Sequence, residues 1–339
     1  MWNKKRPQNK RPKPRGSKAL RIVDTNPYKA VEVCLERLRL CKGDLRLDAS
    51  KGISSKLDEY DLSKFNRISQ ESEQHTIVRG RDGSIYAYHV PQAWLTRNNI
   101  TSEYVNRLVF LLENLPPLRP SEEVKNVQAK RGIRCSRAYQ FWVGSKEGGE
   151  LGVSMQYVKD GPKAKEFVEH CKLLWETLGQ VYDNVFPNPA ATLRNYRASK
   201  DTIVEFLAKP WPGMTINQGC EDEPVETNPH KDSTDAFYQN SCLYACGEFN
   251  GGNVIFWELE CVLEMKSGDA LFVPAHLITH SNTPVTAGVR HSLVAYGRQE
   301  TLTKNQDIRG KQQAEKKAEL IEKRNKRRKM ERMLSSSVE

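Results

Sequence analysis

Between residues 253 and 273 the apolar residues come in short runs and not at helical spacing. The runs at 253–260, 262–265 and 270–273 are rich in β-branched and aromatic side chains, and glycine-containing turns such as 266–269 separate them. Short β-rich runs divided by glycine turns are typical of an all-β sandwich or jelly roll. We therefore expect a jelly roll in this part of the chain.

The first half of the chain has a mixed pattern. Apolar residues at helical spacing predict helices over residues 28–40, 101–115, 162–185 and 199–208. Alternating or β-rich segments predict strands over residues 76–79, 84–90, 137–143, 151–157 and 215–217. The first two of these strands are joined through Gly80 and Gly83, which predicts a β-hairpin.

The predicted fold class is α+β, with a double-stranded β-helix, or jelly-roll, core, supporting helices, and basic tails that are disordered or helical. We expect four parts. They are a basic disordered tail (1–21), a region of helices and strands packed on the core (22–187), the core itself (188–300), and a basic C-terminal helix or tail (301–339).

Charge is concentrated in the two tails. Residues 1–21 contain nine Lys/Arg and no acidic residue, and residues 301–339 contain twelve Lys/Arg against six acidic residues. The tails thus supply +9 and +6 of a total of +11, so the segment between them has a net charge of −4. Basic segments of this kind predict contact with nucleic acid, DNA before RNA, and import into the nucleus, with the cytoplasm as the alternative.

The eight cysteines are scattered without a Cys-x-x-Cys pair, and the first residues lack the apolar stretch of a signal peptide. Reduced thiols in a nuclear or cytosolic setting are therefore expected. Cys242 and Cys246 are interpreted as small buried residues of a strand in preference to zinc ligands. No segment is long and apolar enough to predict a membrane partner.

Candidate chemistry begins at Asn228-Pro-His230-Lys-Asp232. In an extended segment, residues two apart point to the same face, so His230 and Asp232 can aim at one point. A later imidazole would complete a set of two histidines and one carboxylate, which suits non-heme Fe(II) and leaves coordination positions open. His280 is the candidate, and His276, four residues earlier, is its rival.

Ten residues after His280 comes Arg290, followed by Ser292 on the same face of a predicted strand. A guanidinium fork beside a hydroxyl is suited to a carboxylate. His291 is expected to point to the opposite side. A metal site beside a carboxylate clamp indicates iron together with a keto-acid cosubstrate.

The order of these residues resembles that of a known superfamily. The motifs are His230-x-Asp232, Gly251-Gly252, Gly268-Asp269-Ala-Leu-Phe, His280-x3-Pro284-Val285 and Gly288-x-Arg290-x-Ser292. Together they resemble the double-stranded β-helix of the 2-oxoglutarate/Fe(II) oxygenases over about residues 212–299. Within that superfamily the chain is most similar to the fungal TET/JBP-like branch, whose members oxidise methylated bases in nucleic acids.

The resemblance implies that His230, Asp232 and His280 ligate Fe(II) and that Arg290 binds the distal carboxylate of 2-oxoglutarate. It implies a dioxygenase that consumes O2 and 2-oxoglutarate, with ascorbate as a candidate stimulant, and that oxidises 5-methylcytosine or another methylated base in DNA.

Three alternatives stay open. A prolyl- or lysyl-type protein hydroxylase would share the whole iron and cosubstrate motif. A small-molecule oxygenase would leave the basic tails without a purpose. A catalytically inactive DNA-binding relative would not need the intact candidate ligands. The acidic segment 219–227, shortly before His230, is an awkward neighbour for DNA phosphate, which favours a segment that faces the base or a substrate other than nucleic acid.

Overall fold

The structure is a computed structural model that describes residues 21–24, 61–69, 74–79, 84–116, 137–145, 151–198, 206–221, 225–237 and 239–298. The predicted helix 28–40 and, apart from Arg21, the two basic tails lie outside these residues.

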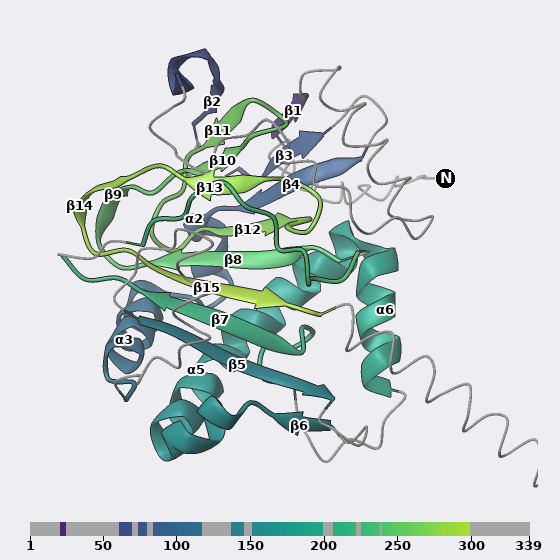
Figure 1. Ribbon diagram of the computed structural model, residues 1–339, viewed down its shortest axis with the longest axis vertical. Coiled ribbons are helices and arrows are strands. Elements are labelled where there is room, and N and C mark those ends of the chain that lie inside the picture. Colours follow the sequence, from purple (N-terminus) through teal and green to yellow (C-terminus); the bar gives the residue numbers. More distant parts are fainter. Residues whose placement is uncertain are drawn as a thin grey trace, which may run out of the picture.

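A nine-stranded sheet forms the centre of the described structure (Figure 1). In spatial order its strands are β1 (Arg21–Asp24), β3 (Thr76–Arg79), β4 (Ile85–Val90), β12 (Ala270–Val273), β8 (Ser241–Cys246), β15 (His291–Tyr296), β7 (Gly213–Gln218), β5 (Arg137–Ser145) and β6 (Leu151–Val153). Neighbours are antiparallel, except that β1 runs parallel to β3. The sheet therefore includes strands from both sides of residue 187.

Two smaller sheets lie beside it. The four-stranded sheet has the order β13 (His280–Asn282), β10 (Val254–Phe256), β11 (Cys261–Leu263) and β2 (Asn66–Ile68). A two-stranded sheet pairs β14 (Val285–Gly288) with β9 (Phe249–Gly251). A 3-10 helix, η2 (Leu62–Lys64), precedes β2.

From β7 onward the chain passes repeatedly between the large and the four-stranded sheet. It runs through β7 and β8 in the large sheet, β10 and β11 in the small one, β12 in the large, β13 in the small and β15 in the large. This is a mixed α+β architecture with extensive antiparallel pairing, and the alternation is consistent with the predicted jelly roll.

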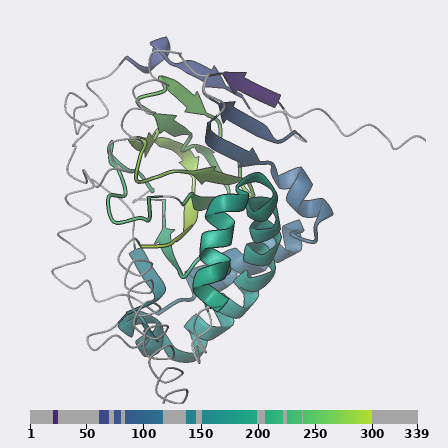
Figure 2. The same ribbon diagram turned by 90° about the vertical axis from the view of Figure 1, so that its right-hand side faces the viewer.

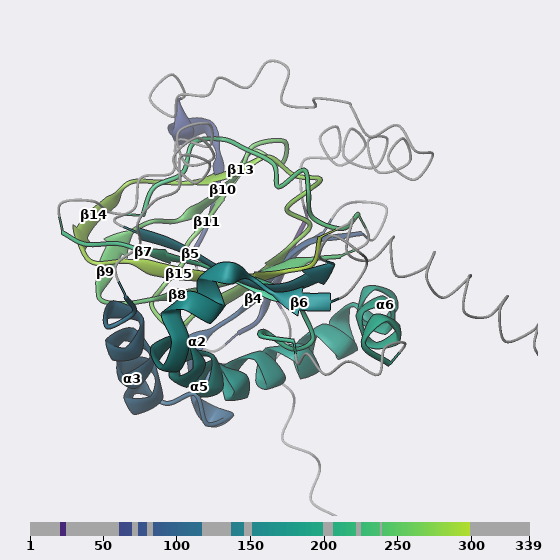
Figure 3. The ribbon, with the colours of Figure 1, turned by 60° about the horizontal axis from the view of Figure 1, so that its bottom comes forward.

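Helices cover the face of the large sheet that is turned away from the four-stranded sheet (Figures 2 and 3). They are α2 (Gln92–Arg97), α3 (Ser102–Glu113), α5 (Met155–Val185) and α6 (Pro187–Ala198). The predicted apolar faces of α3 and α5 are buried in one core cluster with the sheet. Among the described residues, no helix has the length and apolar character needed to cross a bilayer.

Successive side chains along each strand of the large sheet point to opposite faces of the sheet. On β8, Cys242, Tyr244 and Cys246 join the core cluster under the helices, whereas Ser241 and Leu243 line a cavity on the other face. The interpretation of Cys242 and Cys246 as buried residues of a strand is confirmed. One face of the sheet thus anchors the helices while the other is free to build a site.

Aromatic rings fill the centre of the core under the helices. The ring of Phe272 on β12 is 5.6 Å from Tyr182 on α5 and 6.1 Å from Trp211, and these pairs are stacked. Tyr88 and Phe186 pack against it at 6.2 and 5.9 Å. All five rings are at most 8% exposed, so the junction of α5 with the sheet depends on them.

Two predicted element boundaries were wrong. The predicted strand 151–157 ends at Val153, because Ser154 becomes the N-cap of α5. The predicted start at Pro162 is a kink inside α5, where Gly161 has φ 57°. At Gly161, α5 therefore divides into two helical segments, the second beginning with proline.

The predicted helix 199–208 was wrong at residues 206–208, which the structure shows as a turn with a bridge between Ala208 and Trp211; residues 199–205 lie outside the described part. The helix in this region is α6, which begins at Pro187. Proline is favoured in the first helical turn because its missing N–H would have no partner there.

Replacing Phe272 by Ala should lower the free energy of unfolding by about 3–5 kcal/mol, because it removes a buried ring contacted by four others. Urea unfolding followed by circular dichroism measures the change. Phe110→Ala is the matched control, since Phe110 is 52% exposed, and its effect should stay within about 0.5 kcal/mol. Equal effects of the two substitutions would contradict this description of the core.

Candidate functional site

Two backbone hydrogen bonds join His230 to His280. Each residue donates its N–H to the other's carbonyl, at 3.0 and 2.9 Å, in an isolated antiparallel bridge. Asp232 is fixed by its own N–H, which donates to Ala275 O at 2.9 Å. The segment around His230 is thus extended at this bridge, without forming a full strand, and residues fifty positions apart lie together.

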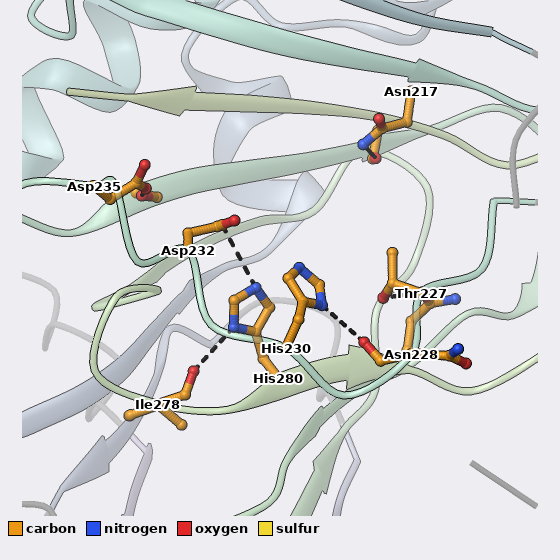
Figure 4. A network of polar contacts seen from close by, with 11 residues as sticks. Asn217, Thr227, Asn228, His230, Asp232, Asp235, Ile278 and His280 are labelled. Atoms are coloured by element: carbon orange, nitrogen blue, oxygen red, sulfur yellow. Dashed lines mark hydrogen bonds and ion pairs between the residues drawn. The ribbon is translucent and has the colours of Figure 1, made fainter. Parts of the chain in front are cut away.

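The three predicted donor residues form one cluster (Figure 4). Their ligand atoms all lie within 4.8 Å of one another. The His280 Nε2 is 3.8 Å from Asp232 Oδ2, and the His230 and His280 rings are 4.5 Å apart and tilted by 49°. Among the described residues this is the one group of three or more His, Cys, Asp or Glu side chains that could hold a metal ion.

Hydrogen bonds of the ring nitrogens set the tautomer of both imidazoles. His230 Nδ1 lies 2.7 Å from Asn228 O, and His280 Nδ1 lies 3.0 Å from Ile278 O. A carbonyl oxygen can only accept, so in the neutral imidazole Nδ1 carries the proton and Nε2 keeps its lone pair. Both rings are therefore prepared to coordinate a metal through Nε2.

The rival histidine lies elsewhere. His276 is 7% exposed and is not part of the donor cluster; its ring is 5.7 Å from that of Phe237. Two imidazoles and one carboxylate, as held by His230, Asp232 and His280, fit a non-heme Fe(II) ion and leave positions for other ligands.

Arg290 is a buried cation in the same cavity. It is 2% exposed, and among the described residues no carboxylate pairs with its guanidinium and its Nε has no hydrogen-bond partner. The ring of Phe249 lies 5.6 Å from the guanidinium carbon. Burial lowers the pKa of Arg290 to about 10, so the group is still charged at neutral pH. A buried charge is costly unless an anion pairs with it.

The surroundings of Gly252 explain why the second residue of the Gly251-Gly252 motif is a glycine. Its φ is 63°, and a Cβ added there would lie 2.6 Å from Arg290 Cδ and 2.9 Å from Nε. The backbone of Gly252 therefore lies against the Arg290 side chain, and only glycine leaves room for it.

The neighbours of Arg290 alternate as predicted. Ser292 lines the cavity and its Oγ accepts from Asn217 Nδ2 at 3.1 Å, so the hydroxyl keeps its own proton to donate. His291 does not line the cavity; its Nδ1 accepts from the N–H of Gly219 at 3.2 Å.

The cavity, of about 140 Å³, lies between the sheets. The donor cluster and Arg290 line it together with alternate residues of β15 and the residues just beyond its end. Continuing past Ser292, these include Val294, Tyr296 and Arg298. Asp235, which forms a backbone bridge with Arg298, also lines the cavity, and its Oδ2 accepts from Ser241 Oγ at 2.6 Å; Gln140 lines the cavity from β5. One wall thus has a guanidinium at each end.

Sequence reasoning did not identify several polar residues that line the cavity, namely Gln140, Asn217, Thr227, Asp235, Asn282, Tyr296 and Arg298. The two-residue period that linked Arg290 to Ser292 could have been extended to Tyr296 and Arg298. The others come from distant segments. Thr227 Oγ1, for example, donates to Asn282 Oδ1 at 2.9 Å across fifty-five positions.

No family model matches the sequence, and no curated protein matches it. Solved structures similar to this chain include NgTET1 in complex with 5mC DNA, with 15% identity, a TM-score of 0.48 and coverage of 82% of this chain and 93% of that one. A 2OG-Fe(II) oxygenase family oxidoreductase from Burkholderia pseudomallei has 16% identity, a TM-score of 0.28 and coverage of 52% and 75%.

A third similar structure is the viral collagen prolyl hydroxylase of Paramecium Bursaria Chlorella virus-1 in its 2OG complex, with 12% identity, a TM-score of 0.31 and coverage of 63% and 96%. The predicted resemblance to 2-oxoglutarate/Fe(II) oxygenases, with a TET protein among them, thus recurs among solved structures. Since the TM-scores of these three structures are below 0.5, the function proposed below depends on the site itself.

Stability should fall in mild acid because of His291. Burial, followed by the charge of Arg290, lowers the pKa of His291 to about 4. Glu113 Oε1 lies 3.5 Å from His291 Nε2, but this carboxylate is on a half-exposed side chain and does not offset the effect of burial. As the pH falls, His291 is therefore protonated in the unfolded chain near pH 6.5, before it is protonated in the folded chain. The stabilisation is complete above that pH and is lost as pH falls towards 4, by up to about 3 kcal/mol.

Urea unfolding between pH 7.5 and 4 measures this loss, and His291→Asn should remove part of the slope. The comparison of the two proteins matters because carboxylates also contribute to acid unfolding. Parallel curves for both proteins would show that His291 is not buried in its neutral form.

Proposed function

We propose that this chain is an Fe(II)- and 2-oxoglutarate-dependent dioxygenase that oxidises a methylated base in DNA, with 5-methylcytosine as the first candidate. The observation that carries the proposal is the presence, in one cavity, of the His230, Asp232 and His280 donors and of a buried Arg290 that no carboxylate in the described part of the chain pairs with. The donors suit Fe(II), and the guanidinium suits the distal carboxylate of 2-oxoglutarate.

Each residue has a distinct task in this proposal. His230, Asp232 and His280 would hold Fe(II), which when bound supplies the activation of O2 coupled to decarboxylation of 2-oxoglutarate to succinate and CO2. Arg290 binds and orients the cosubstrate through a two-point fork, and the Ser292 hydroxyl donates to the same carboxylate. Gly252 leaves room for the Arg290 side chain beside it.

The opposite end of the wall supports a nucleobase as substrate. A cytosine edge presents an amino donor next to acceptors. In this proposal the Asp235 carboxylate, which lines the cavity, accepts from the amino group. Arg298 and Gln140 supply donors for the acceptors. A base in duplex DNA would have to be flipped into the cavity, at a cost of a few kcal/mol.

The basic tails support nucleic acid as the partner and the nucleus as the location. Residues 1–21 and 301–339 carry +9 and +6, whereas the segment between them is mildly acidic. In this proposal the tails hold DNA phosphates and the cavity receives the base, so affinity for DNA should fall steeply with salt.

Nucleoside mass spectrometry after incubation with 5-methylcytosine DNA, Fe(II), ascorbate and 2-oxoglutarate tests the proposal. We expect hydroxymethyl, formyl or carboxyl products from the unaltered chain and none from His280→Ala, which loses a metal donor. His276→Ala is the matched control and should retain the products, since His276 lies outside the donor cluster.

The other outcomes are also informative. Formation of succinate without an oxidised base would support the oxygenase reaction but contradict 5-methylcytosine as the substrate. RNA, thymine or a protein side chain would then be the next substrate to test. Equal activity of the unaltered chain and His280→Ala would contradict the metal site. If the unaltered chain formed neither succinate nor an oxidised base, the proposal that it is an oxygenase would be contradicted.

The two arginines of the wall should separate kinetically. Arg290→Lys keeps the charge but loses the fork, so the KM for 2-oxoglutarate should rise about 100-fold, which corresponds to ~3 kcal/mol. Arg298→Lys should leave that KM unchanged and raise the KM for methylated DNA. Steady-state rates with each substrate varied in turn measure both. A rise in the 2-oxoglutarate KM for Arg298→Lys alone would reverse the assignment of the two ends.

A further inference from the structure

A buried carboxylate lies behind the metal donors, outside the cavity. Glu258 is 9% exposed and stands in the turn between β10 and β11. It does not line the cavity, so it cannot contact a substrate there. A buried carboxylate is costly unless it is paired and hydrogen-bonded, and its partners therefore indicate what it does.

Two of its contacts are with Thr279, the residue directly before His280. The N–H of Thr279 donates to Glu258 Oε2 at 2.8 Å, and its hydroxyl donates to Oε1 at 2.6 Å. Thr279 is fully buried. Hydrogen bonds to an ionised group are shorter and stronger than neutral ones, so this pair fixes the backbone from which His280 projects.

The third contact is with Lys231, the residue between His230 and Asp232. Lys231 Nζ lies 3.2 Å from Glu258 Oε1, and the two side chains are 12% and 10% exposed. In an extended segment Lys231 points away from the face that its neighbours share. Its ammonium therefore reaches Glu258 on the outer side, while His230 and Asp232 face the cavity.

Trp257, next to Glu258, holds the other side of His280. Its N–H donates to Thr279 O at 3.1 Å and its indole Nε1 donates to Ser281 Oγ at 3.0 Å. The ring packs edge-on against Phe65, with centroids 5.6 Å apart. The turn at 257–258 thus grips both residues that flank His280.

We propose that Glu258 is a positioning residue for the metal centre, because one carboxylate ties the segment of His230 and Asp232 to the strand of His280. This inference rests on the proposed function of the site. Without the Glu258 carboxylate, the ion pair to Lys231 and the two hydrogen bonds from Thr279 are weakened or lost, so the two segments can move apart. The three donors would then have to be brought together by the metal itself, which weakens binding.

Co(II) is a suitable probe, since it binds such donor sets and its visible absorption depends on coordination geometry. Anaerobic titration of the full chain gives the affinity and the spectrum. Glu258→Gln should weaken binding about 10–100-fold and alter the spectrum, although thermal unfolding shows a folded protein. Glu264→Gln is the matched control: this glutamate contacts Lys266 at 3.9 Å with a side chain that is 37% exposed, and its substitution should change neither.

Thr279→Val provides a second variant in case Glu258→Gln does not fold. It keeps the size and the backbone donor and removes only the hydroxyl bond, so a several-fold loss of affinity is expected. Unaltered affinity and spectrum in the folded variants would overturn the positioning role alone. Failure of the unaltered chain to bind Co(II) would overturn the proposed metal site and the positioning role together.

Discussion

The rest of the site depends on the pair of backbone hydrogen bonds between His230 and His280. In a β-pair, a slip by one residue turns every side chain to the opposite face. A slip of the first segment would present Lys231 to the cavity in place of His230. The register of this bridge, supported from outside by Glu258, therefore decides whether the donors meet.

The large sheet keeps its structural and chemical tasks on opposite faces. Apolar and aromatic residues of β7, β8, β12 and β15 pack under the helices, while alternate residues of the same strands line the cavity. Rigid strands can hold polar groups that loops would let move. Arg290, a buried cation without a carboxylate partner among the described residues, is placed in this way directly before β15.

The sequence was sufficient where a local period determined the outcome. The two-residue period placed His230 with Asp232 and Arg290 with Ser292, and helical spacing identified the buried faces of α3 and α5. It failed where competing local signals met, as at Ser154 and Gly161, which extend α5 backwards past Pro162.

Residues that act through distant partners could not be predicted either. In the sequence Glu258 and Lys231 look like ordinary surface charges, and only the pairing of segments buries them together. The most direct test of the central claim is anomalous diffraction from crystals containing Mn(II) and 2-oxoglutarate. The account predicts one Mn(II) bound by His230, Asp232 and His280, with the distal carboxylate on Arg290. A metal bound elsewhere, or a carboxylate away from Arg290, would contradict it.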